Sequence, residues 1–573
     1  MDTNDKEDSQ KKSEDVGQRR SPFDLFFNPR KKSTKGKNEL FSMNRFFKAF
    51  ERETEKAPKE KEPQDSQDKT STHDNPDVDV NTPGKEETQL PGLDISGWWK
   101  VKQFMQRFGK KAESNCINLN NCGLTAMDME ELGTLLAFIP DTEEIDLSWN
   151  DLIGGSIRLL TPYLQQVGKL KIFSLSNCSL TPNDVNALGE ALEHIPLLES
   201  LDLSWNSDLG GNLSRLTQHI STQCELKALY LTECNVRAAD GKPLSHALNK
   251  MPNLEVLDLS MNKDIGSIIR TLIDELKTKS SLSVLKLHGT GLQQETIQSL
   301  SDVFHNWPYL RKLDLSCNKE AGGGFKEAAA RLTTFKHLEL LDIHQCCLSG
   351  DDVDALTQVV PLLSNLQVLN ISSNKMVGHS PEHLFSRLRF LPKLKCIIVS
   401  SCSLKKESFS ALAEASRYLV DLEILDLSWN KCIGGNLKLL LDTLKTATKL
   451  QSLMLSSCDL VTQDLAVLAS AAQAGYLDSL QHLDLAYNDT IADEGWALFF
   501  ESLYAINNIT ELDVSLRPGS TRDCGAWVIH LLSSMLKLPK LKELGMQRWV
   551  LSAAEQQQLE RINKESMIHI YFE

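Results

Sequence analysis

Alternating apolar residues in a Leu-x-Leu pattern recur along most of this chain, and each pattern is followed by a Cys or an Asn three residues later. These turn residues are Cys122, Asn150, Cys178, Asn206, Cys234, Asn262, Thr290, Asn318, Cys346, Asn374, Cys402, Asn430 and Cys458. The step from each to the next is constant, and only Thr290 breaks the alternation of Cys and Asn. So regular a period predicts a solenoid built from pairs of repeats, in which each repeat packs on its neighbours.

The pattern inside one repeat predicts a strand, a turn and a helix. Phe173 and Leu175 alternate with polar residues, as in a short strand with one buried face. Thr181 is a helix cap, Pro182 suits the first helical position and Asp184 the third. The helix itself is predicted by an apolar stripe of Val185, Leu188, Leu192 and Ile195, which ends before Pro196.

No such unit can bury its own apolar edges, so the strands should form a parallel sheet on the inside and the helices an outer ring. The predicted fold class is therefore α/β: a leucine-rich horseshoe of about sixteen strand-turn-helix units over residues 117–549, with an N-terminal cap helix at 95–116 and a C-terminal cap at 550–573. A buried Asn after a strand can satisfy backbone groups of adjacent turns, and Cys is a small residue with a weak donor at the same place. Glycines follow the strand in the Asn-type units, where a tight or positive-φ turn is expected.

Residues 1–94 are polar and show no sustained apolar period, which predicts a disordered tail. Within it, the segment 19–53 gathers aromatic residues, including Phe23, Phe26, Phe27, Phe46, Phe47 and Phe50. Between Arg19 and Arg52 there are ten Lys or Arg and three acidic residues. This basic, Phe-rich segment could dock on another protein, plug the horseshoe or lie on an anionic membrane. An uncommitted tail with chance aromatics is the remaining alternative.

Composition narrows the class of protein further. A formal net charge of −15 argues against binding to nucleic acid, which needs basic surface. The beginning, MDTNDKEDSQKK, has no apolar signal region, and no run of residues is long and apolar enough to cross a membrane. We therefore expect a cytoplasmic protein, monomeric, with its thirteen cysteines reduced.

Equal repeats with alternating Cys and Asn endings resemble the leucine-rich repeats of the ribonuclease-inhibitor-like class. The resemblance rests on segments such as INLNNCGLT and LSWNKCIGGNLKLLLDTLK. It implies a cytosolic binding scaffold without chemistry of its own.

Motifs that carry chemistry are missing from the sequence. No G-x-x-x-x-G-K-[ST], G-x-S-x-G, C-x-x-C or H-E-x-x-H occurs, so we expect neither an enzyme nor a bound cofactor or metal ion. His288 and His344 occupy inner-face positions, where a lone histidine is expected to face solvent.

Two columns of residues on the predicted inner face are candidate binding positions. The first is acidic and contains Asp146, Asp202, Asp258, Asp314, Asp342, Asp426, Asp484 and Asp513. These aspartates either select a basic protein partner, or they are a common structural feature of such repeats, in which Asp bonds to Ser or to the backbone of adjacent strands. The second is aromatic and contains Trp149, Trp205, Trp429 and Tyr487, with Met261, Cys317 and Ser373 in register. These side chains either contribute to the free energy of binding at a protein interface or pack against the next turn of the repeat domain.

The sequence therefore predicts a non-enzymatic scaffold that binds a protein on its concave face and carries a linear motif in its tail. Three alternatives remain open. They are a cytosolic enzyme inhibitor, a leucine-rich-repeat regulator of GTPases, and an adaptor that makes peripheral membrane contact through the Phe-rich segment.

Overall fold

The computed structural model describes residues 95–573, apart from 222–223, 380–382, 567 and 573. The chain divides into two units, Met1–Glu87 and Thr88–Glu573, and the described residues belong to the second. The predicted tail and its phenylalanines lie outside the described residues.

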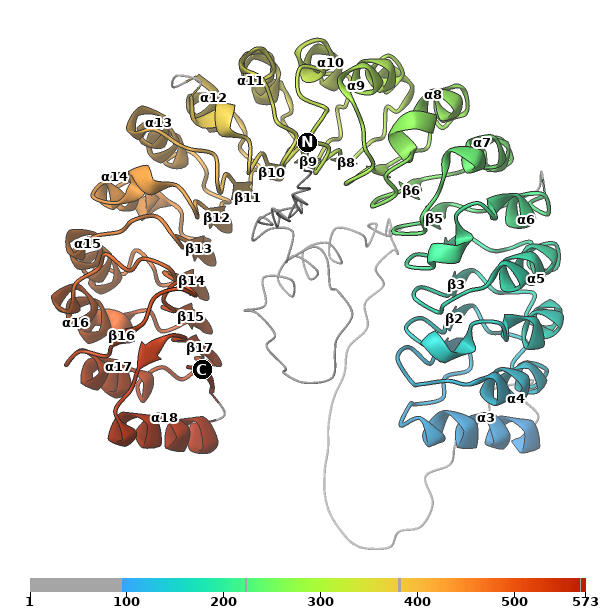
Figure 1. Cartoon of the computed structure of the whole chain (residues 1–573), viewed down its shortest axis with the longest axis horizontal. Helices are drawn as coiled ribbons and strands as arrows, with labels where there is room; N and C mark the ends of the chain where they lie inside the picture. The colour runs from blue at the N-terminus through green and yellow to red at the C-terminus, as the bar shows by residue number, and fades with distance from the viewer. Residues whose placement is uncertain (1–94, 222–223, 380–382, 567, 573) are drawn as a thin grey trace, which may run out of the picture. The chain divides into compact units, whose positions relative to one another are not determined.

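One parallel sheet of 17 strands runs through the described part of the chain (Figure 1). Each strand pairs with the strand before and after it, usually one repeat away, as in Phe173↔Leu201. The strands are β1 Cys116–Asn118, β2 Glu144–Asp146, β3 Ile172–Ser174, β4 Ser200–Asp202, β5 Ala228–Tyr230, β6 Val256–Asp258, β7 Val284–Lys286, β8 Lys312–Asp314, β9 Leu340–Asp342, β10 Val368–Asn370, β11 Cys396–Ile398, β12 Ile424–Asp426, β13 Ser452–Met454, β14 His482–Asp484, β15 Glu511–Asp513, β17 Glu543–Gly545 and β19 His569–Tyr571. A separate pair is formed by β16 Arg522–Asp523 and β18 Trp549–Val550.

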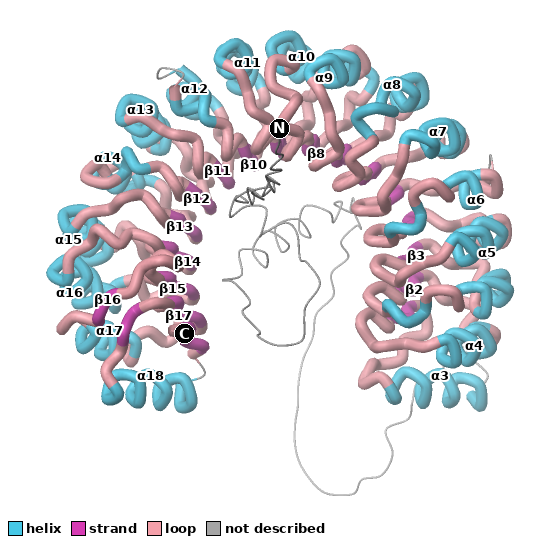
Figure 2. The backbone as a smooth tube through the Cα atoms, in the orientation of Figure 1, coloured by secondary structure: helices cyan, strands magenta, loops and turns pink. Residues whose placement is uncertain are grey.

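Helices form the outer ring of the same arc, so that strands line the inside and helices the outside (Figure 2). They are α3 Ile95–Arg107, α4 Ala126–Leu136, α5 Pro182–Leu192, α6 Leu213–Thr217, α7 Gly241–Asn249, α8 Ile265–Leu276, α9 Gln294–Ser301, α10 Phe325–Leu332, α11 Gly350–Val359, α12 His383–Arg387, α13 Lys406–Ser416, α14 Leu437–Leu441, α15 Thr462–Gln473, α16 Asp493–Ser502, α17 Val528–Met535 and α18 Ala553–Ser566. The predicted cap of α5 is confirmed, since Thr181 and Asp184 form a capping box. The α/β horseshoe is confirmed too.

A single apolar core lies between the sheet and the helices. Leu201 and Leu203, on either side of Asp202, are 2% and 0% exposed, and their equivalents in the other repeats are buried in the same way. The core is continuous along the arc because each repeat leaves its apolar edges for the next repeat to cover.

The turn asparagines join each Asn-type repeat to the one before it. The side-chain oxygen of Asn206 accepts the backbone N–H groups of Cys178 and Leu180, both at 3.1 Å. Its amide nitrogen donates to the carbonyl of Leu175 at 2.9 Å and to that of Leu203 at 2.8 Å. Asn206 is fully buried, so these bonds satisfy backbone groups that water cannot reach.

Cysteine makes the backward link in the other repeat type. The Cys178 thiol donates to the carbonyl of Leu147 in the preceding repeat at 3.2 Å. Thr290, the exception in the series, donates instead to the carbonyl of Leu287 in its own repeat at 2.7 Å. All thirteen cysteines lie within the described residues, and all are free thiols. Cys122 is only half-buried, and its thiol donates to Asn120 in its own turn.

The two glycines that follow Asn-type strands are required for two different structural reasons. A Cβ on Gly210 would lie 1.7 Å from the carbonyl oxygen of Asn235, so the backbones of two repeats touch there. Gly211 has a φ of 81°, which side chains rarely tolerate. The following repeat then fixes this loop, because Asp240 accepts the N–H of Gly211 at 2.6 Å.

This carboxylate bond recurs wherever the second glycine is present. Asp352 accepts from Gly323 at 2.6 Å and Asp464 from Gly435 at 2.7 Å. Where Ser267 or His379 replaces the second glycine, the acceptor position is occupied by Thr296 or Ser408 instead. The second glycine and the aspartate of the following repeat therefore act together, which explains why the true period is two repeats.

In the Asn-type repeats that have the second glycine, the outer segment differs from the expected single helix, whereas the Asn262 repeat, with Ser267 at that position, keeps the 12-residue helix α8. After Asn150 the chain forms three 3-10 turns, Asp151–Ile153, Ile157–Leu159 and Thr161–Gln166. The glycine loop uses residues that a helix would need. Helix α6 begins seven residues after Asn206, whereas α5 begins four residues after Cys178. Because the period is fixed, the helix after such a loop is shortened, to five residues in α6 and in α14.

A candidate binding surface on the inner face

The acidic column occupies the last position of the strands, and the register places these positions side by side across the sheet. Eight of the 17 positions are aspartates and one, Lys286, is a lysine. Of the aspartates, Asp258 and Asp426 are buried and the others are partly exposed. The lysine Nζ lies 3.9 Å from the Asp258 carboxylate.

Each carboxylate accepts a backbone N–H of its own chain, and some also bond to a side chain of a neighbouring repeat, as expected. Asp202 accepts the N–H of Ser204, two residues later, at 2.9 Å, and Asp426 accepts that of Ser428 at the same distance. The chain turns out of the strand at this point, which brings this N–H back to the carboxylate. One oxygen of each carboxylate therefore forms a hydrogen bond that stabilises the turn after the strand. Bonds between repeats are present at Asp342, which accepts from Asn370 on the next strand at 2.9 Å, and at Asp146, which accepts from Asn120 at 3.4 Å.

Burial raises the pKa of several of these carboxyl groups. The pKa values of Asp202 and Asp426 lie above the ordinary value because of desolvation, and neighbouring Asp258 and Asp146 add to the effect at Asp202. The pKa of Asp484 rises to about 8, first through burial and then through the charge of Asp513 on the next strand. A column whose carboxylates repel one another is favourable for positive charge.

The aromatic column lies one turn beyond the strands. Trp149 and Trp429 are 43% and 40% exposed, whereas Trp205 and Tyr487 are partly buried. The rings of Trp429 and Tyr487 are in contact, with centroids 6.2 Å apart. All four residues have φ values of 63° or 64°, in the left-handed region. Bulky side chains pay a conformational cost there that glycine would avoid.

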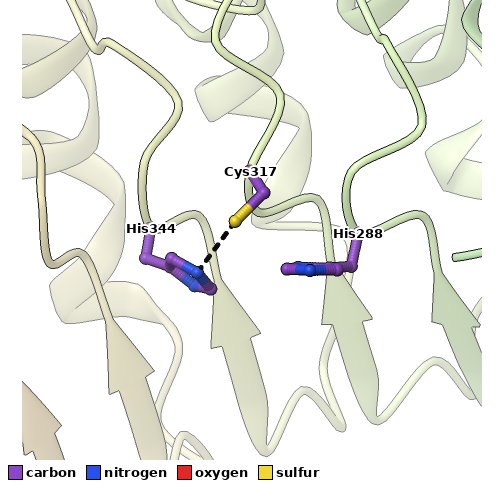
Figure 3. A group of neighbouring side chains, drawn as sticks. All are labelled: His288, Cys317 and His344. Carbon is purple, nitrogen blue, oxygen red and sulfur yellow. Dashed lines mark hydrogen bonds between the residues drawn. The ribbon is translucent and has the colours of Figure 1, made fainter. Parts of the chain in front are cut away.

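Two histidines and a cysteine meet at the crown of the arc (Figure 3). His288 follows β7, Cys317 follows β8 and His344 follows β9, and the three side chains point toward one another. Their ligand atoms all lie within 4.8 Å of one another, and the Cys317 Sγ is 3.2 Å from the His344 Nε2. His344 is only 2% exposed, so the expectation of a solvent-facing histidine is wrong at this position.

Hydrogen bonds orient both imidazole rings of this His–Cys cluster. The Nδ1 of His344 lies 2.7 Å from a carboxylate oxygen of Asp342, and that of His288 lies 2.8 Å from the hydroxyl of Ser316. The Ser316 hydroxyl itself donates to Asp314 at 2.5 Å, so it accepts from His288. Both histidines therefore carry their proton on Nδ1 in the neutral state, which leaves a lone pair on Nε2.

The electrostatics of the cluster follow from these contacts. Burial opposes ionisation of Cys317, but the interactions of its sulfur with the imidazoles of His288 and His344 outweigh it and lower the pKa of the thiol. Burial also opposes charging of His344, yet the carboxylate of Asp342 outweighs it and raises the pKa of the imidazole well above its ordinary value.

Sequence reasoning missed this cluster because it compared residues only within the acidic and aromatic columns. His288 and His344 lie between these columns, Cys317 belongs to the aromatic one, and only the register of three successive strands brings them together. A search for His and Cys residues one repeat apart would have found them.

Comparison with known proteins agrees with this architecture. A family model described as Leucine Rich repeat matches residues 250–269 and 477–497, and a second, described as Leucine Rich Repeat, matches residues 365–387. The chain is a leucine-rich-repeat solenoid.

The relatives of this leucine-rich-repeat chain include inhibitors and larger repeat proteins. It is 28% identical to the ribonuclease inhibitor of Sus scrofa over 70% of this chain and 88% of that protein. The ribonuclease inhibitor of Mus musculus is 27% identical over 72% of this chain and 90% of its own length. The NLR family CARD domain-containing protein 4 of Bos taurus is 23% identical over 76% of this chain but only 39% of its own. The repeats thus have ribonuclease-inhibitor-like features.

A solved structure of a Leptospira interrogans LRR protein is 18% identical to the chain, covers 77% of it and has a TM-score of 0.43. Among the described residues, no helix is long and apolar enough to cross a membrane.

Proposed function

We propose that this protein is a non-enzymatic scaffold that binds a basic protein partner on the inner face of its repeats. The observation that carries the proposal is the acidic column with an exposed aromatic edge one turn away. The positions that we assign to partner binding are Asp146, Trp149, Asp202, Trp205, Asp258, Asp314, Asp426, Trp429 and Tyr487.

Mutual repulsion in the column supports a basic partner. Desolvation and neighbouring carboxylates raise the pKa of Asp202, so a lysine or arginine brought next to it would relieve an unfavourable charge. Such contacts mainly accelerate association and weaken as salt is added.

Conformational cost at the aromatic edge also supports the proposal. Trp149 and Trp429 keep large apolar rings exposed at left-handed positions where glycine would be more stable. Tryptophan carries binding energy at many protein interfaces, because its ring buries a large area at low entropic cost. The fold requires the left-handed turn but does not require the ring.

Inhibition of an enzyme is the second function that we consider, because the relatives include two named ribonuclease inhibitors. It predicts tight binding to one basic secreted-type enzyme, whereas a general scaffold predicts binding without loss of the partner's activity.

Affinity purification with mass spectrometry tests both versions, with full-length protein as bait. The informative variant carries Asp202→Asn with Asp258→Asn. Its matched control carries Glu295→Gln with Glu327→Gln, two exposed residues of helices α9 and α10 that change the net charge by the same amount. We expect a basic partner to be lost from the first variant and retained by the second. Equal recovery on both would contradict the proposal. Assay of a recovered enzyme's activity then separates inhibitor from scaffold.

We also propose that the tail, residues 1–94, carries a linear site at 19–53 with Phe23, Phe26, Phe27, Phe46, Phe47 and Phe50, and that caps at 95–116 and 550–573 flank repeats over 117–549. The protein is proposed to be a cytoplasmic monomer.

Sedimentation of the full chain with anionic vesicles tests membrane contact, since replacement of Phe46 and Phe47 by Ser should abolish it. Lys56→Gln with Lys59→Gln, outside the segment, is the control. If the wild-type chain does not bind vesicles, the Phe-rich segment is left with two binding targets, a groove on another protein or the repeat domain of this chain.

A further inference from the structure

The His–Cys cluster of His288, Cys317 and His344 has features that a partner-binding surface does not need. Three residues of metal-ligand type come from three successive repeats and converge within 4.8 Å. Elsewhere in the described part of the chain no comparable group of His, Cys, Asp and Glu ligand atoms comes together. We propose that these three residues form a zinc-binding site whose fourth coordination position is open to water on the inner face.

Ligand chemistry favours zinc. Two imidazole nitrogens and one thiolate form the mixed N/S set that Zn²⁺ prefers, whereas Ca²⁺ and Mg²⁺ prefer oxygen ligands. Three protein ligands with one open position are typical of zinc sites that exchange their fourth ligand, because fully structural sites use four protein ligands.

The distances require only small adjustments. Zinc lies about 2.3 Å from sulfur and about 2.0–2.1 Å from nitrogen, so tetrahedral ligand atoms are roughly 3.3–3.6 Å apart. The Cys317 Sγ and the His344 Nε2 are already 3.2 Å apart. The longest separation in the cluster is under 4.8 Å and must shorten by about 1 Å, which a small side-chain rotation provides.

The groups around the ligands are those that zinc sites use to fix a histidine. Asp342 holds the Nδ1 of His344 at 2.7 Å, and Asn370 holds the other carboxylate oxygen at 2.9 Å. Ser316 holds the Nδ1 of His288 at 2.8 Å. The Nε2 atoms are thereby left as the ligand atoms of both rings, and a carboxylate–histidine pair such as Asp342–His344 orients the ring and increases its basicity.

An entry path is present as well. His344 is buried, but Cys317 and His288 are partly exposed, so an ion reaches the cluster from the inner face without opening the core. The inference is independent of the proposed partner, because it rests on the cluster alone. It replaces the expectation from sequence that the chain holds no metal ion.

The test titrates the full-length chain, stripped with a chelator and kept reduced, with Zn²⁺ in competition with a chromophoric chelator. Co²⁺ is the spectroscopic probe, because tetrahedral thiolate coordination gives a thiolate-to-cobalt absorption. We expect one equivalent bound and a charge-transfer band that added Zn²⁺ removes. Cys317→Ser should lose the band and weaken zinc binding about 100-fold or more.

Cys347→Ser is the matched control. Cys347 follows the same strand as His344 but is exposed and outside the cluster, so this variant should bind like the wild type. Persistence of the cobalt band in Cys317→Ser, equal loss in both variants, or no band in the wild type would overturn the site. Preference for Cu⁺ with no zinc binding would overturn the assignment to zinc.

A measurement on the wild-type protein covers the case in which Cys317→Ser fails to fold. Iodoacetamide modification is followed at each cysteine by peptide mass spectrometry, with and without Zn²⁺. Zinc should slow modification of Cys317 at least tenfold and leave that of Cys347 unchanged. Rapid modification of Cys317 that zinc does not affect would show a thiol–imidazole pair without a metal site.

Discussion

Asp184 accepts the backbone N–H of Gly155, which belongs to the preceding repeat, at 2.5 Å. The same carboxylate group accepts the N–H of Ile157 at 3.0 Å and the N–H of its own helix cap, Thr181, at 2.9 Å. One buried side chain therefore caps a helix and fixes the loop of its neighbour. The horseshoe is held by such shared groups as much as by its apolar core.

Replacement of Asp184 by Ala should lower the free energy of unfolding by about 3 kcal/mol, because several buried N–H groups lose a charged acceptor. Chemical denaturation of the full chain measures the change. Glu190→Ala on the same helix is the control. Glu190 is exposed and accepts only from Asn186, so it should cost less than about 0.5 kcal/mol. Equal effects would mean that the link between repeats contributes nothing.

Replacement of Asn206 by Ala should cost about 3–5 kcal/mol, since the loss of its side-chain hydrogen bonds leaves buried backbone N–H and carbonyl groups unpaired. Asn206→Asp should cost at least as much, because a carboxylate cannot donate to the carbonyls of Leu175 and Leu203. Thermal melting of both variants beside Asn186→Ala, in which the changed asparagine of α5 bonds only to Glu190, checks the prediction. A near-normal melt for Asn206→Ala would show that the asparagine ladder is dispensable.

Stability should fall as pH rises from about 6 to about 8, because the Asp484 carboxyl has a folded-state pKa of about 8 against 3.8 in the unfolded chain. A group whose pKa is raised by folding stabilises the fold below its unfolded pKa and loses that contribution as pH passes the folded value. We expect a loss of about 2 kcal/mol between about pH 6 and pH 8. Urea unfolding at a series of pH values should show a flatter profile for Asp484→Asn. Unchanged slopes in both proteins would refute the assignment.

His482 should limit stability on the acid side. Burial lowers the pKa of its imidazole from 6.5 to about 4 in the folded protein. A group whose pKa is depressed by folding contributes stability above its unfolded pKa, and this contribution is lost as pH falls toward the folded value. Stability of the wild type should therefore decline between about pH 6.5 and pH 4, and His482→Gln should decline less over the same range. Urea unfolding at these pH values distinguishes the two proteins.

Trp429→Gly should leave stability unchanged or raise it by up to about 1 kcal/mol, because glycine relieves the left-handed backbone at this position. The same change should weaken partner binding if the aromatic edge belongs to the interface. Melting temperature and recovery of the partner in affinity purification are measured together. A stable variant with full binding would remove Trp429 from the proposed site.

The repeat register could be predicted from sequence because it depends on a period that every unit repeats. The Cys and Asn positions, the inner strands and the outer helices all follow from that period. The 3-10 turns after Asn150 could not be predicted, because the space taken by the glycine loop depends on its contacts with the next repeat. Gly155 and Asp184 stand at a fixed spacing in the sequence, but the hydrogen bond between them could be recognised only once the structure placed the two residues side by side.

The candidate site could be predicted only in part. The acidic and aromatic columns are properties of single positions, so sequence places them on the inner face. Their hydrogen bonds and exposures depend on how the chain turns after each strand, as at Asp202 and Ser204. Cys317 lies close to two histidines only because three strands are neighbours in the sheet, so the cluster cannot be predicted from the sequence of any single repeat.

Pairing of each strand only with the one before and the one after has a mechanical consequence. No strand spans the arc from end to end, so bending is shared among many junctions that each move very little. A rotation of about one degree at every junction would change the opening between the two ends by more than about ten degrees, roughly in proportion to the number of repeats. Small rotations at many junctions would therefore let the width of the arc change without breaking any single pair of strands.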